Sequence, residues 1–341
     1  MTDINQLVRQ NILHMHPYSS ARKEYKGSEG IFVDANENPF GKYNRYPDGE
    51  QSQLKQAISK VKNIVVKNIF LGNGSDEIID LLFRIFCRPG VDKVISFTPT
   101  YGMYEVSAAL NDVEIIEIPL TKDFQPDLNI LQKYVNDESC KLLFICSPNN
   151  PTGNLMDQKL VTEMLQKFNG IVVIDEAYID FCDEESFANK IDQYPNLVVL
   201  QTLSKAWGLA ALRIGIGFSA EAIIDLLNKV KPPYNISTAN QQGALKALEN
   251  IKEFETTLEI LKQERKKLSM ALKDIDCIKK VYPTDANFFL VEVTDANKIY
   301  QQLISQKIIV RNRNSVLKNC LRISIGTPEE NDILIKALKQ L

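Results

Sequence analysis

Short apolar runs rich in β-branched residues recur along the chain, and helix-like segments separate several of them. The strand-length runs occupy residues 94–97, 113–118, 142–146, 171–174, 197–200 and 214–218. Apolar residues at helical spacing occupy residues 101–110, 127–134 and 157–168. Strands that alternate with helices are typical of a large wound, mostly parallel sheet with helices on both faces. The pattern therefore predicts an α/β fold that binds its ligands at the carboxyl ends of the strands.

This alternation stops at Lys231-Pro232-Pro233, where a pair of prolines would end any helix. Residues 236–271 then predict two helices, followed by strands at 286–293, 308–310 and 320–325 and a last helix at 328–341. A chain of 341 residues is too long for one ordinary core. We predict a large domain at residues 41–232 and a smaller α+β domain at 233–341, with residues 1–40 forming an N-terminal arm and part of the small domain.

Composition and charge exclude several classes of protein. Hydrophobic residues make up 44% of the chain and charged residues 24%, which is typical of a globular protein. The net charge of -3 offers no basic surface for nucleic acid or for an anionic membrane. We see neither a secretory signal at the start nor an apolar run long enough to span a bilayer, so we expect a cytoplasmic protein.

Cysteine and histidine are too sparse for the common metal, disulfide or hydrolase arrangements. The six cysteines are scattered and never form C-x-x-C, which argues against a zinc site or a disulfide framework. The two histidines, His14 and His16, and the absence of G-x-S-x-G argue against a Ser/His/Asp triad. We expect no metal.

A glycine-containing turn precedes a helix-like run in LGNGSDEIIDLLFRIFC, residues 71–87. Ser75 and Asp76 lie where the helical pattern begins, and the free amides of a helix start attract phosphate. An ordinary capped helix would show the same residues. Glu77 replaces the third glycine of a dinucleotide fingerprint, and G-x-x-x-x-G-K-[ST] is absent, so nucleotide binding is disfavoured.

Two further turns carry candidate ligands after strands. Tyr101 lies in FTPTYGMY, where its ring can stack on a flat cofactor or pack in the core. Asn150 lies in SPNNPTG, a turn that its prolines and glycine make rigid. A fixed amide can donate a hydrogen bond to a phenolate oxygen, although turn geometry alone also accounts for an asparagine.

Lys205, in TLSKAWGLAALRIG, and Asp175, in VVIDEAYIDF, complete a cofactor hypothesis. The Lys205 amine can form a Schiff base with an aldehyde and then act as a general base and acid, whereas most lysines are only surface charges. Asp175 can cap a helix or pair with a protonated pyridine nitrogen. Tyr178 can bond the ring hydroxyl. Ser204 and Arg213 suit a cofactor phosphate.

Together these motifs resemble the aspartate-aminotransferase-like, fold-type-I pyridoxal-phosphate enzymes and, within them, the histidinol-phosphate aminotransferase family. The resemblance covers nearly the whole chain. SPNNPTG, DEAY and SK with the following arginine mark the superfamily. The segments HPYSSARKEY, DANENPFG, NRYPDG and CLRISIGTPEE narrow it to the histidinol-phosphate group.

The resemblance implies that pyridoxal 5'-phosphate is the cofactor and assigns its ligands. Lys205 would carry the aldehyde, Asp175 would pair with the ring nitrogen, and Tyr178 and Asn150 would bond the ring hydroxyl. Tyr101 would stack on the ring. The positions around the cofactor phosphate would be Ser75, Asp76, Ser204 and Arg213.

A homodimer and a substrate-binding set are also implied. Tyr46 matches a tyrosine that this family contributes from the neighbouring subunit to the cofactor phosphate. Arg322 matches the arginine that grips the anionic end of the substrate, with Arg311, Tyr18 and Asn36 as its neighbours. Arg311 and Arg313 in RNRN compete for one role, and Trp207 and Ala211 stand where the family pattern has phenylalanine and glycine.

The implied reaction exchanges an amino group between L-histidinol phosphate and 2-oxoglutarate, giving imidazole-acetol phosphate and glutamate, in histidine biosynthesis. Arginines that form bidentate bonds can accept both a carboxylate and a phosphate. Two alternatives keep the fold and cofactor: an aromatic amino-acid aminotransferase and a phosphothreonine-type decarboxylase. A third is a non-catalytic protein that retains the cofactor, against which the lysine, aspartate and arginines argue.

Overall fold

The computed structural model describes residues 4–18, 24–25 and 29–341. Its strands are β1 (Ile69–Asn73), β2 (Lys93–Thr98), β3 (Glu114–Pro119), β4 (Cys140–Cys146), β5 (Ile171–Asp175), β6 (Leu197–Thr202), β7 (Ile214–Ser219), β8 (Ile278–Val281), β9 (Phe288–Val293), β10 (Arg311–Asn312) and β11 (Cys320–Ser324). Its α-helices are α1 (Ile4–Leu7), α2 (Gln10–His14), α4 (Ser52–Lys62), α5 (Ser75–Phe86), α6 (Met103–Leu110), α7 (Leu128–Leu131), α8 (Gln158–Lys167), α9 (Glu221–Val230), α10 (Thr238–Glu249), α11 (Ile251–Lys273), α12 (Ala296–Ser305) and α13 (Pro328–Leu338). None of these described helices is long and apolar enough to cross a membrane.

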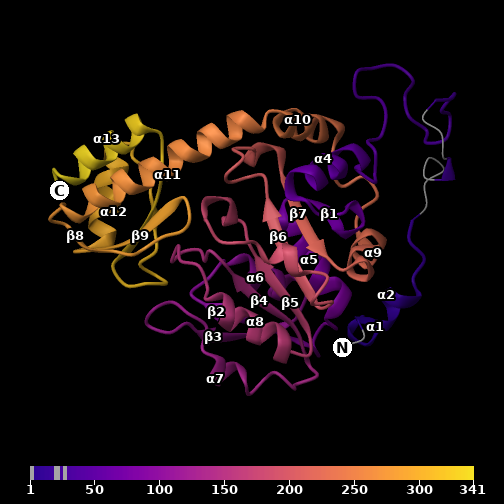
Figure 1. The fold of residues 1–341 in the computed structure, drawn as a ribbon, viewed down its shortest axis with the longest axis horizontal. Helices are drawn as coiled ribbons and strands as arrows, with labels where there is room; N and C mark the ends of the chain where they lie inside the picture. The colour runs from indigo at the N-terminus through magenta and orange to yellow at the C-terminus, as the bar shows by residue number, and fades with distance from the viewer. Residues whose placement is uncertain (1–3, 19–23, 26–28) are drawn as a thin grey trace.

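Seven strands form the large sheet in the order β1-β7-β6-β5-β4-β2-β3 (Figure 1). Strand β7 runs antiparallel to both of its neighbours, and the remaining pairs are parallel. The predicted mostly parallel sheet is therefore confirmed.

Helices cover both faces of this sheet, as the sequence predicts. Strand β5 is buried along its whole length, and its alternate residues belong to different cores. Val172 and Ile174 pack in a core that also includes residues of α4, α8 and α10. Ile171 and Val173 pack in a second core with residues of α5, α6 and α9. A strand buried on both faces explains the continuous apolar run in the sequence.

The smaller sheet is antiparallel in the order β10-β11-β9-β8. Helices α11, α12 and α13 cover one of its faces with a separate apolar core. The long helix α11 runs from α10, above the large sheet, to the small sheet (Figure 1). Phe288 of β9 packs with Tyr178 and Ala206 in a small cluster that joins the two sheets next to the strand ends. The α+β character predicted for the C-terminal part is confirmed.

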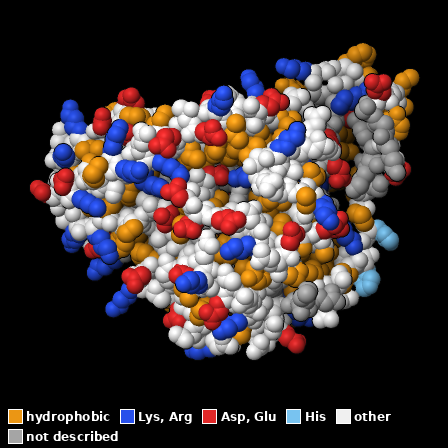
Figure 2. All heavy atoms as spheres, in the orientation of Figure 1, with side chains coloured by type: hydrophobic (Ala, Val, Ile, Leu, Met, Phe, Trp, Pro, Cys, Tyr) orange, Lys and Arg blue, Asp and Glu red, His pale blue; other side chains and the backbone are white. Residues whose placement is uncertain are grey.

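Segments on both sides of the predicted domain boundaries pack against the large sheet and its helices. Ile4, Val8 and Ile12 belong to a core of the large sheet, and α10 packs against α4. Beyond α2 the chain leaves the body, with Ile31 93% exposed and Phe40 82% exposed. Apolar side chains lie on this projecting segment at the upper right of Figure 2. The domain boundaries at residues 40 and 232 stay predictions.

Several elements differ from the sequence-based expectations. Strands β1 and β8 and helix α12 were not expected, and residues 308–310 precede β10 rather than forming a strand. The helix expected over residues 127–134 is limited to α7. The sequence does not predict strand β8, because only its end residues, Ile278 and Val281, are apolar. The intervening Lys279 and Lys280 are exposed.

Candidate active site

A cavity of about 770 Å³ lies where the large sheet meets the small one. The last residues of β2, β4, β5 and β6 all line it, so it lies at the carboxyl ends of parallel strands. Most of the predicted site residues line the same cavity: Ser75, Asp76, Tyr101, Asn150, Asp175, Tyr178, Ser204, Lys205, Arg213, Arg311 and Arg322.

Asp175 ends β5 and is 3% exposed. Its Oδ2 accepts a hydrogen bond of 2.8 Å from the Tyr104 hydroxyl, and its Oδ1 accepts one of 3.1 Å from the Ala177 amide. Burial raises the pKa of Asp175, and the bond from Tyr104 opposes that rise. A buried carboxylate with only neutral donors is a suitable partner for a cationic ring nitrogen.

Lys205 enters the cavity from the turn after β6, with its Nζ 5.5 Å from the centre of the Tyr178 ring. Partial burial lowers the pKa of Lys205, and the positive charge of Arg322 lowers it further. A lysine with a lowered pKa has more of the neutral amine that attacks an aldehyde. The lysine chemistry expected from the sequence is thus supported by the electrostatics of the cavity.

Tyr178 is held firmly beside the lysine. Its ring is 6% exposed and meets the Phe288 ring edge to face, with the centroids 5.2 Å apart. Burial raises the pKa of Tyr178, so its phenol stays protonated and able to donate a hydrogen bond. The small sheet therefore orients a side chain of the large domain.

A cradle for an anion lies at the start of α5. Ser75 is the first residue of this helix, and Gly74 before it adopts a φ of 81°. A Cβ on Gly74 would lie 2.5 Å from Nη2 of Arg213, and a Cβ on Gly215 would lie 2.3 Å from the Ser75 amide nitrogen. These glycines let the helix amides and an arginine approach one point closely.

Ser204 supplies the strongest sign that this cradle fits a phosphate. Its Oγ is buried and has no hydrogen-bond partner among the residues that the structure describes. Buried hydroxyls are almost always bonded, so an unpartnered one beside a helix start and an arginine suits a ligand oxygen. The Arg213 Nη2 atom lies 3.6 Å from Oδ2 of Asp76, which holds the arginine near the helix start. The residues present fit the phosphate of the expected cofactor.

Tyr101, the expected stacking residue, lines the cavity. Its hydroxyl donates a hydrogen bond of 3.0 Å to Oδ1 of Asp76, and its ring lies at 86° to that of Tyr104. Burial raises the pKa of Tyr101, which keeps the hydroxyl a donor. Two contacts therefore fix the plane of the ring.

The part of the cavity lining that the small sheet supplies is strongly basic. Arg322 donates a hydrogen bond from Nη1 to Oδ1 of Asn150, and its guanidinium lies 5.2 Å from the centre of the Phe288 ring. Because Oδ1 of Asn150 is the acceptor, its amide nitrogen remains free to donate. Arg311 is the cross-strand neighbour of Arg322 on β10 and β11.

Three predicted residues lie outside this cavity. The Tyr46 ring stacks on Tyr234, with the centroids 4.5 Å apart. Asn36 and Tyr46 line a different cavity of about 430 Å³, and Tyr18 is 69% exposed. A single chain does not bring them to the site. Residues 19–23 of the HPYSSARKEY motif lie outside the described part of the chain.

The sequence patterns do not identify Tyr104 as a site residue, and they give Arg313 no role separate from that of Arg311. Both line the cavity. Tyr104 follows Tyr101 by three residues, so the helical spacing in PTYGMY places both near the strand ends, which was the available signal. It was missed because an apolar-facing tyrosine in a helix looks like ordinary core.

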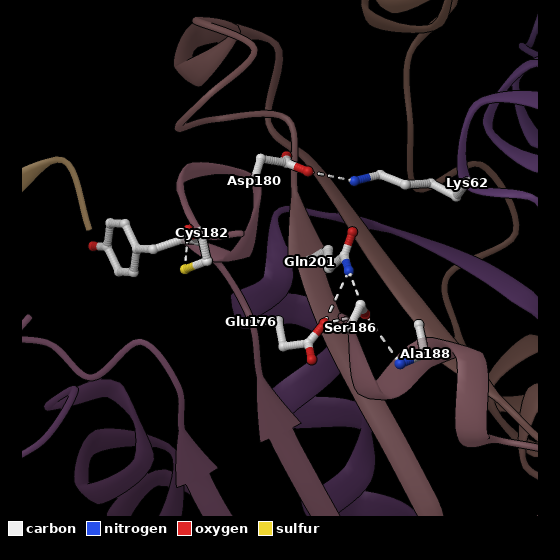
Figure 3. A network of polar contacts seen from close by, with 8 residues as sticks. Lys62, Glu176, Asp180, Cys182, Ser186, Ala188 and Gln201 are labelled. Carbon is white, nitrogen blue, oxygen red and sulfur yellow. Dashed lines mark hydrogen bonds and ion pairs between the residues drawn. The ribbon is translucent and has the colours of Figure 1, made fainter. Parts of the chain in front are cut away.

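Glu176, the residue after Asp175, anchors a polar network outside the cavity (Figure 3). Its carboxylate accepts hydrogen bonds from the Ser186 hydroxyl, from the Phe187 amide at 2.8 Å and from Nε2 of Gln201 at 3.0 Å. Burial raises the pKa of Glu176 to about 6. Nearby, Lys62 and Asp180 form an ion pair of 2.7 Å. The network ties the end of β5 to β6 and to residues 186–188.

Comparison with known proteins agrees with this geometry. The family model described as aminotransferase class I and II matches residues 21–338. A histidinol-phosphate aminotransferase of Flavobacterium johnsoniae is 50% identical, over 99% of this chain and 99% of the relative. The crystal structure of histidinol-phosphate aminotransferase from Clostridium acetobutylicum has a TM-score of 0.80 at 26% identity, covering 87% of this chain and 90% of that one.

A further likeness includes a bound cofactor. The crystal structure of histidinol-phosphate aminotransferase from Sinorhizobium meliloti in complex with pyridoxal-5'-phosphate has a TM-score of 0.80 at 25% identity, covering 90% of this chain and 89% of that one. The sheet order, the cavity at the strand ends and these likenesses agree. The chain belongs to the class I and II aminotransferases and, within them, to the histidinol-phosphate aminotransferase family.

Proposed function

We propose that this chain uses pyridoxal 5'-phosphate to transfer an amino group between L-histidinol phosphate and 2-oxoglutarate, in histidine biosynthesis. The observation that carries the proposal is one cavity that is lined by Lys205, the buried Asp175, the residues of the phosphate cradle and three arginines. Each of these groups suits one part of the cofactor or substrate.

The cofactor would be held by residues at the strand ends. Ser75, Ser204 and Arg213 would bind its phosphate, Asp175 its ring nitrogen, and Asn150 and Tyr178 its ring hydroxyl. When bound, pyridoxal phosphate supplies an aldehyde that exchanges with amines and a ring that withdraws electrons from the substrate. Asp175 would favour a proton on the ring nitrogen, because a carboxylate in a buried site favours a positive partner.

Lys205 would move the protons of the reaction. Its lowered pKa allows Nζ, once free, to take a proton from the substrate carbon that bears the amino group. The same Nζ would then hold this proton and could release it again, so Lys205 would serve as both base and acid. Tyr178, 6% exposed beside it, helps to keep water from this path.

Arg322 and Arg311 would bind the anionic end of each substrate. A guanidinium can bond a carboxylate or a phosphate with two parallel hydrogen bonds, so one site accepts glutamate and histidinol phosphate in turn. Asn150 and Phe288 hold Arg322 in place.

A homodimer in the cytoplasm completes the proposal. The exposed apolar side chains of the segment that carries Tyr46 support its burial against a second subunit. In that arrangement Tyr46 would reach the partner's cofactor phosphate, with Tyr18 and Asn36 near the substrate.

The test is a panel of single-turnover reactions with the cofactor-loaded enzyme. Histidinol phosphate, phenylalanine and phosphothreonine would each be mixed with it, and cofactor absorbance and products would be followed. We expect the fastest conversion with histidinol phosphate, and imidazole-acetol phosphate as the product. Faster conversion of phenylalanine would favour the aromatic aminotransferase, and release of carbon dioxide from phosphothreonine would favour the decarboxylase.

A further inference from the structure

Arg313 shares the basic end of the cavity with Arg311 and Arg322. Arg311 and Arg322 are directly opposite on β10 and β11, so their side chains leave the same face of the small sheet. The Arg313 amide donates a hydrogen bond of 2.9 Å to the Cys320 carbonyl, which extends the strand pairing by one step. Because alternate residues of a strand lie on the same face, Arg313 lies on the same face as Arg311.

No protein group neutralises these three arginines within the described part of the chain. The acidic residues that line the cavity are Asp76, Glu105, Glu117 and Asp175, and none of them forms an ion pair with Arg311, Arg313 or Arg322. Asp76 is paired with Arg213 instead.

Arg313 in particular is poised for an outside ligand. Its side chain is half-buried, and its Nε is buried with no hydrogen-bond partner among residues 4–18, 24–25 and 29–341. Burial lowers the pKa of Arg313, and the charges of Arg322 and Arg311 lower it further. An arginine still remains protonated, so the repulsion persists until an anion enters.

We infer that Arg313 is a specificity-determining residue, the third guanidinium of an anion site that favours a phosphate monoester dianion over a carboxylate. The inference rests on the proposed function, because it concerns the same substrate pocket. It assigns Arg311 and Arg313 joint rather than competing roles.

The chemistry of the two anions explains the preference. A phosphate monoester carries a charge of about -1.5 to -2 at pH 7 and has three strong acceptor oxygens. A carboxylate has one charge and two oxygens, which a single bidentate arginine such as Arg322 can satisfy. A third guanidinium therefore adds more to phosphate binding than to carboxylate binding.

Substitution of Arg313 separates these two contributions. In the Arg313→Gln holoenzyme we expect the KM for histidinol phosphate to rise about 10-fold to 100-fold, because a charged hydrogen bond is lost. The KM for glutamate should rise by a clearly smaller factor, about threefold. Lys318→Gln is the matched control, since it removes an exposed positive charge from the same turn without altering the cavity lining.

Inorganic phosphate gives a second readout that does not depend on turnover of histidinol phosphate. It should compete with glutamate in the wild-type holoenzyme, and Arg313→Gln should raise its inhibition constant about 10-fold or more, whereas Lys318→Gln should not. Arg313→Lys should give intermediate values, because it keeps the charge and loses the fork of donors. If Arg313→Gln fails to fold, the same measurements on Arg313→Lys test the role of Arg313.

The outcomes distinguish the two proposals. Equal effects on glutamate and histidinol phosphate, or unchanged constants in the Arg313 variants, would overturn the role of Arg313 while histidinol phosphate remained a substrate. Failure of the wild type to convert histidinol phosphate would overturn the proposed function, and the phosphate competition would still report on Arg313.

Discussion

The Tyr104 hydroxyl donates a hydrogen bond of 2.8 Å to Oδ2 of Asp175, and both residues are almost completely buried. The Tyr104 ring also stacks on Phe144, with the centroids 4.7 Å apart, and meets Tyr101 edge to face. One side chain thus connects the expected stacking ring to the carboxylate expected beneath the cofactor. Tyr104 is a positioning residue, because it acts through Asp175.

Removal of this hydroxyl should weaken catalysis and shift its pH dependence. In Tyr104→Phe we expect kcat to fall about 10-fold, which corresponds to about 1.4 kcal/mol. The bond lowers the pKa of Asp175, so its loss raises that pKa and moves the acid limb of the kcat profile to higher pH. A pH series of kcat measures the shift.

Phe144→Leu is the control for Tyr104→Phe. It loosens the ring stacking but keeps the hydroxyl, so it should reduce stability without moving the acid limb. An acid limb that is the same in wild type and Tyr104→Phe would show that Tyr104 has only a packing role.

Ser204→Ala should separate cofactor binding from stability. The Ser204 hydroxyl has no hydrogen-bond partner in the described part of the chain, so its removal should change the free energy of unfolding of the apoenzyme by less than about 0.5 kcal/mol. The Kd for pyridoxal phosphate should rise about 10-fold, because a hydrogen bond to a charged oxygen is lost. Denaturation of the apoenzyme and cofactor titration measure the two effects.

Ser219→Ala is the matched control, because it should lower stability without changing the affinity for the cofactor. The Ser219 hydroxyl is buried and donates a hydrogen bond of 2.6 Å to the Leu197 carbonyl, outside the cavity. Its loss should destabilise the apoenzyme by about 1 kcal/mol and leave the cofactor Kd unchanged. Unaltered cofactor affinity in Ser204→Ala would remove Ser204 from the phosphate site.

Glu176 should make stability fall as pH rises between about 4.5 and 6. Burial raises its folded-state pKa from 4.5 to about 6, so in this window the folded protein binds more protons than the unfolded chain. Above the folded-state pKa, the buried Glu176 carboxylate should lower the free energy of unfolding by about 2 kcal/mol. Chemical denaturation across pH should show this slope in the wild type and not in Glu176→Gln. The same slope in both would assign it to another group.

Mixing two variants should test whether Tyr46 serves the partner's site. Lys205→Ala and Tyr46→Ala homodimers should each have little activity. If each subunit supplies its Tyr46 to the partner's site, a mixed dimer has one site in which both Lys205 and Tyr46 are intact. Random mixing makes about half of the dimers mixed, so it should restore about a quarter of wild-type activity. Assay after unfolding and joint refolding measures it. No restoration, with mixed dimers present, would place Tyr46 outside the partner's site.

The sequence predicts the large sheet well because fully buried strands read as continuous apolar runs, as in β5. It misses β8, an edge strand with exposed lysines at its centre. Most of the site residues of the large domain lie just after such a strand or near a helix start, whereas Arg213 lies immediately before β7.

The remainder of the site depends on contacts that one sequence does not specify. Tyr104 reaches Asp175 only because α6 packs over the sheet, and Arg313 joins Arg322 only through the pairing of β10 with β11. The position of Tyr46 depends on the path of the exposed segment and on a second subunit, which local patterns do not encode.

The Schiff-base role of Lys205 is tested most directly by borohydride reduction of the cofactor-loaded wild-type enzyme, followed by peptide mapping. Reduction fixes an imine between the cofactor and its lysine as a stable amine. We expect one modified peptide, with the cofactor on Lys205, and no comparable labelling in Lys205→Ala. Stoichiometric labelling of another lysine in the wild type, or undiminished labelling of a single lysine in Lys205→Ala, would contradict it.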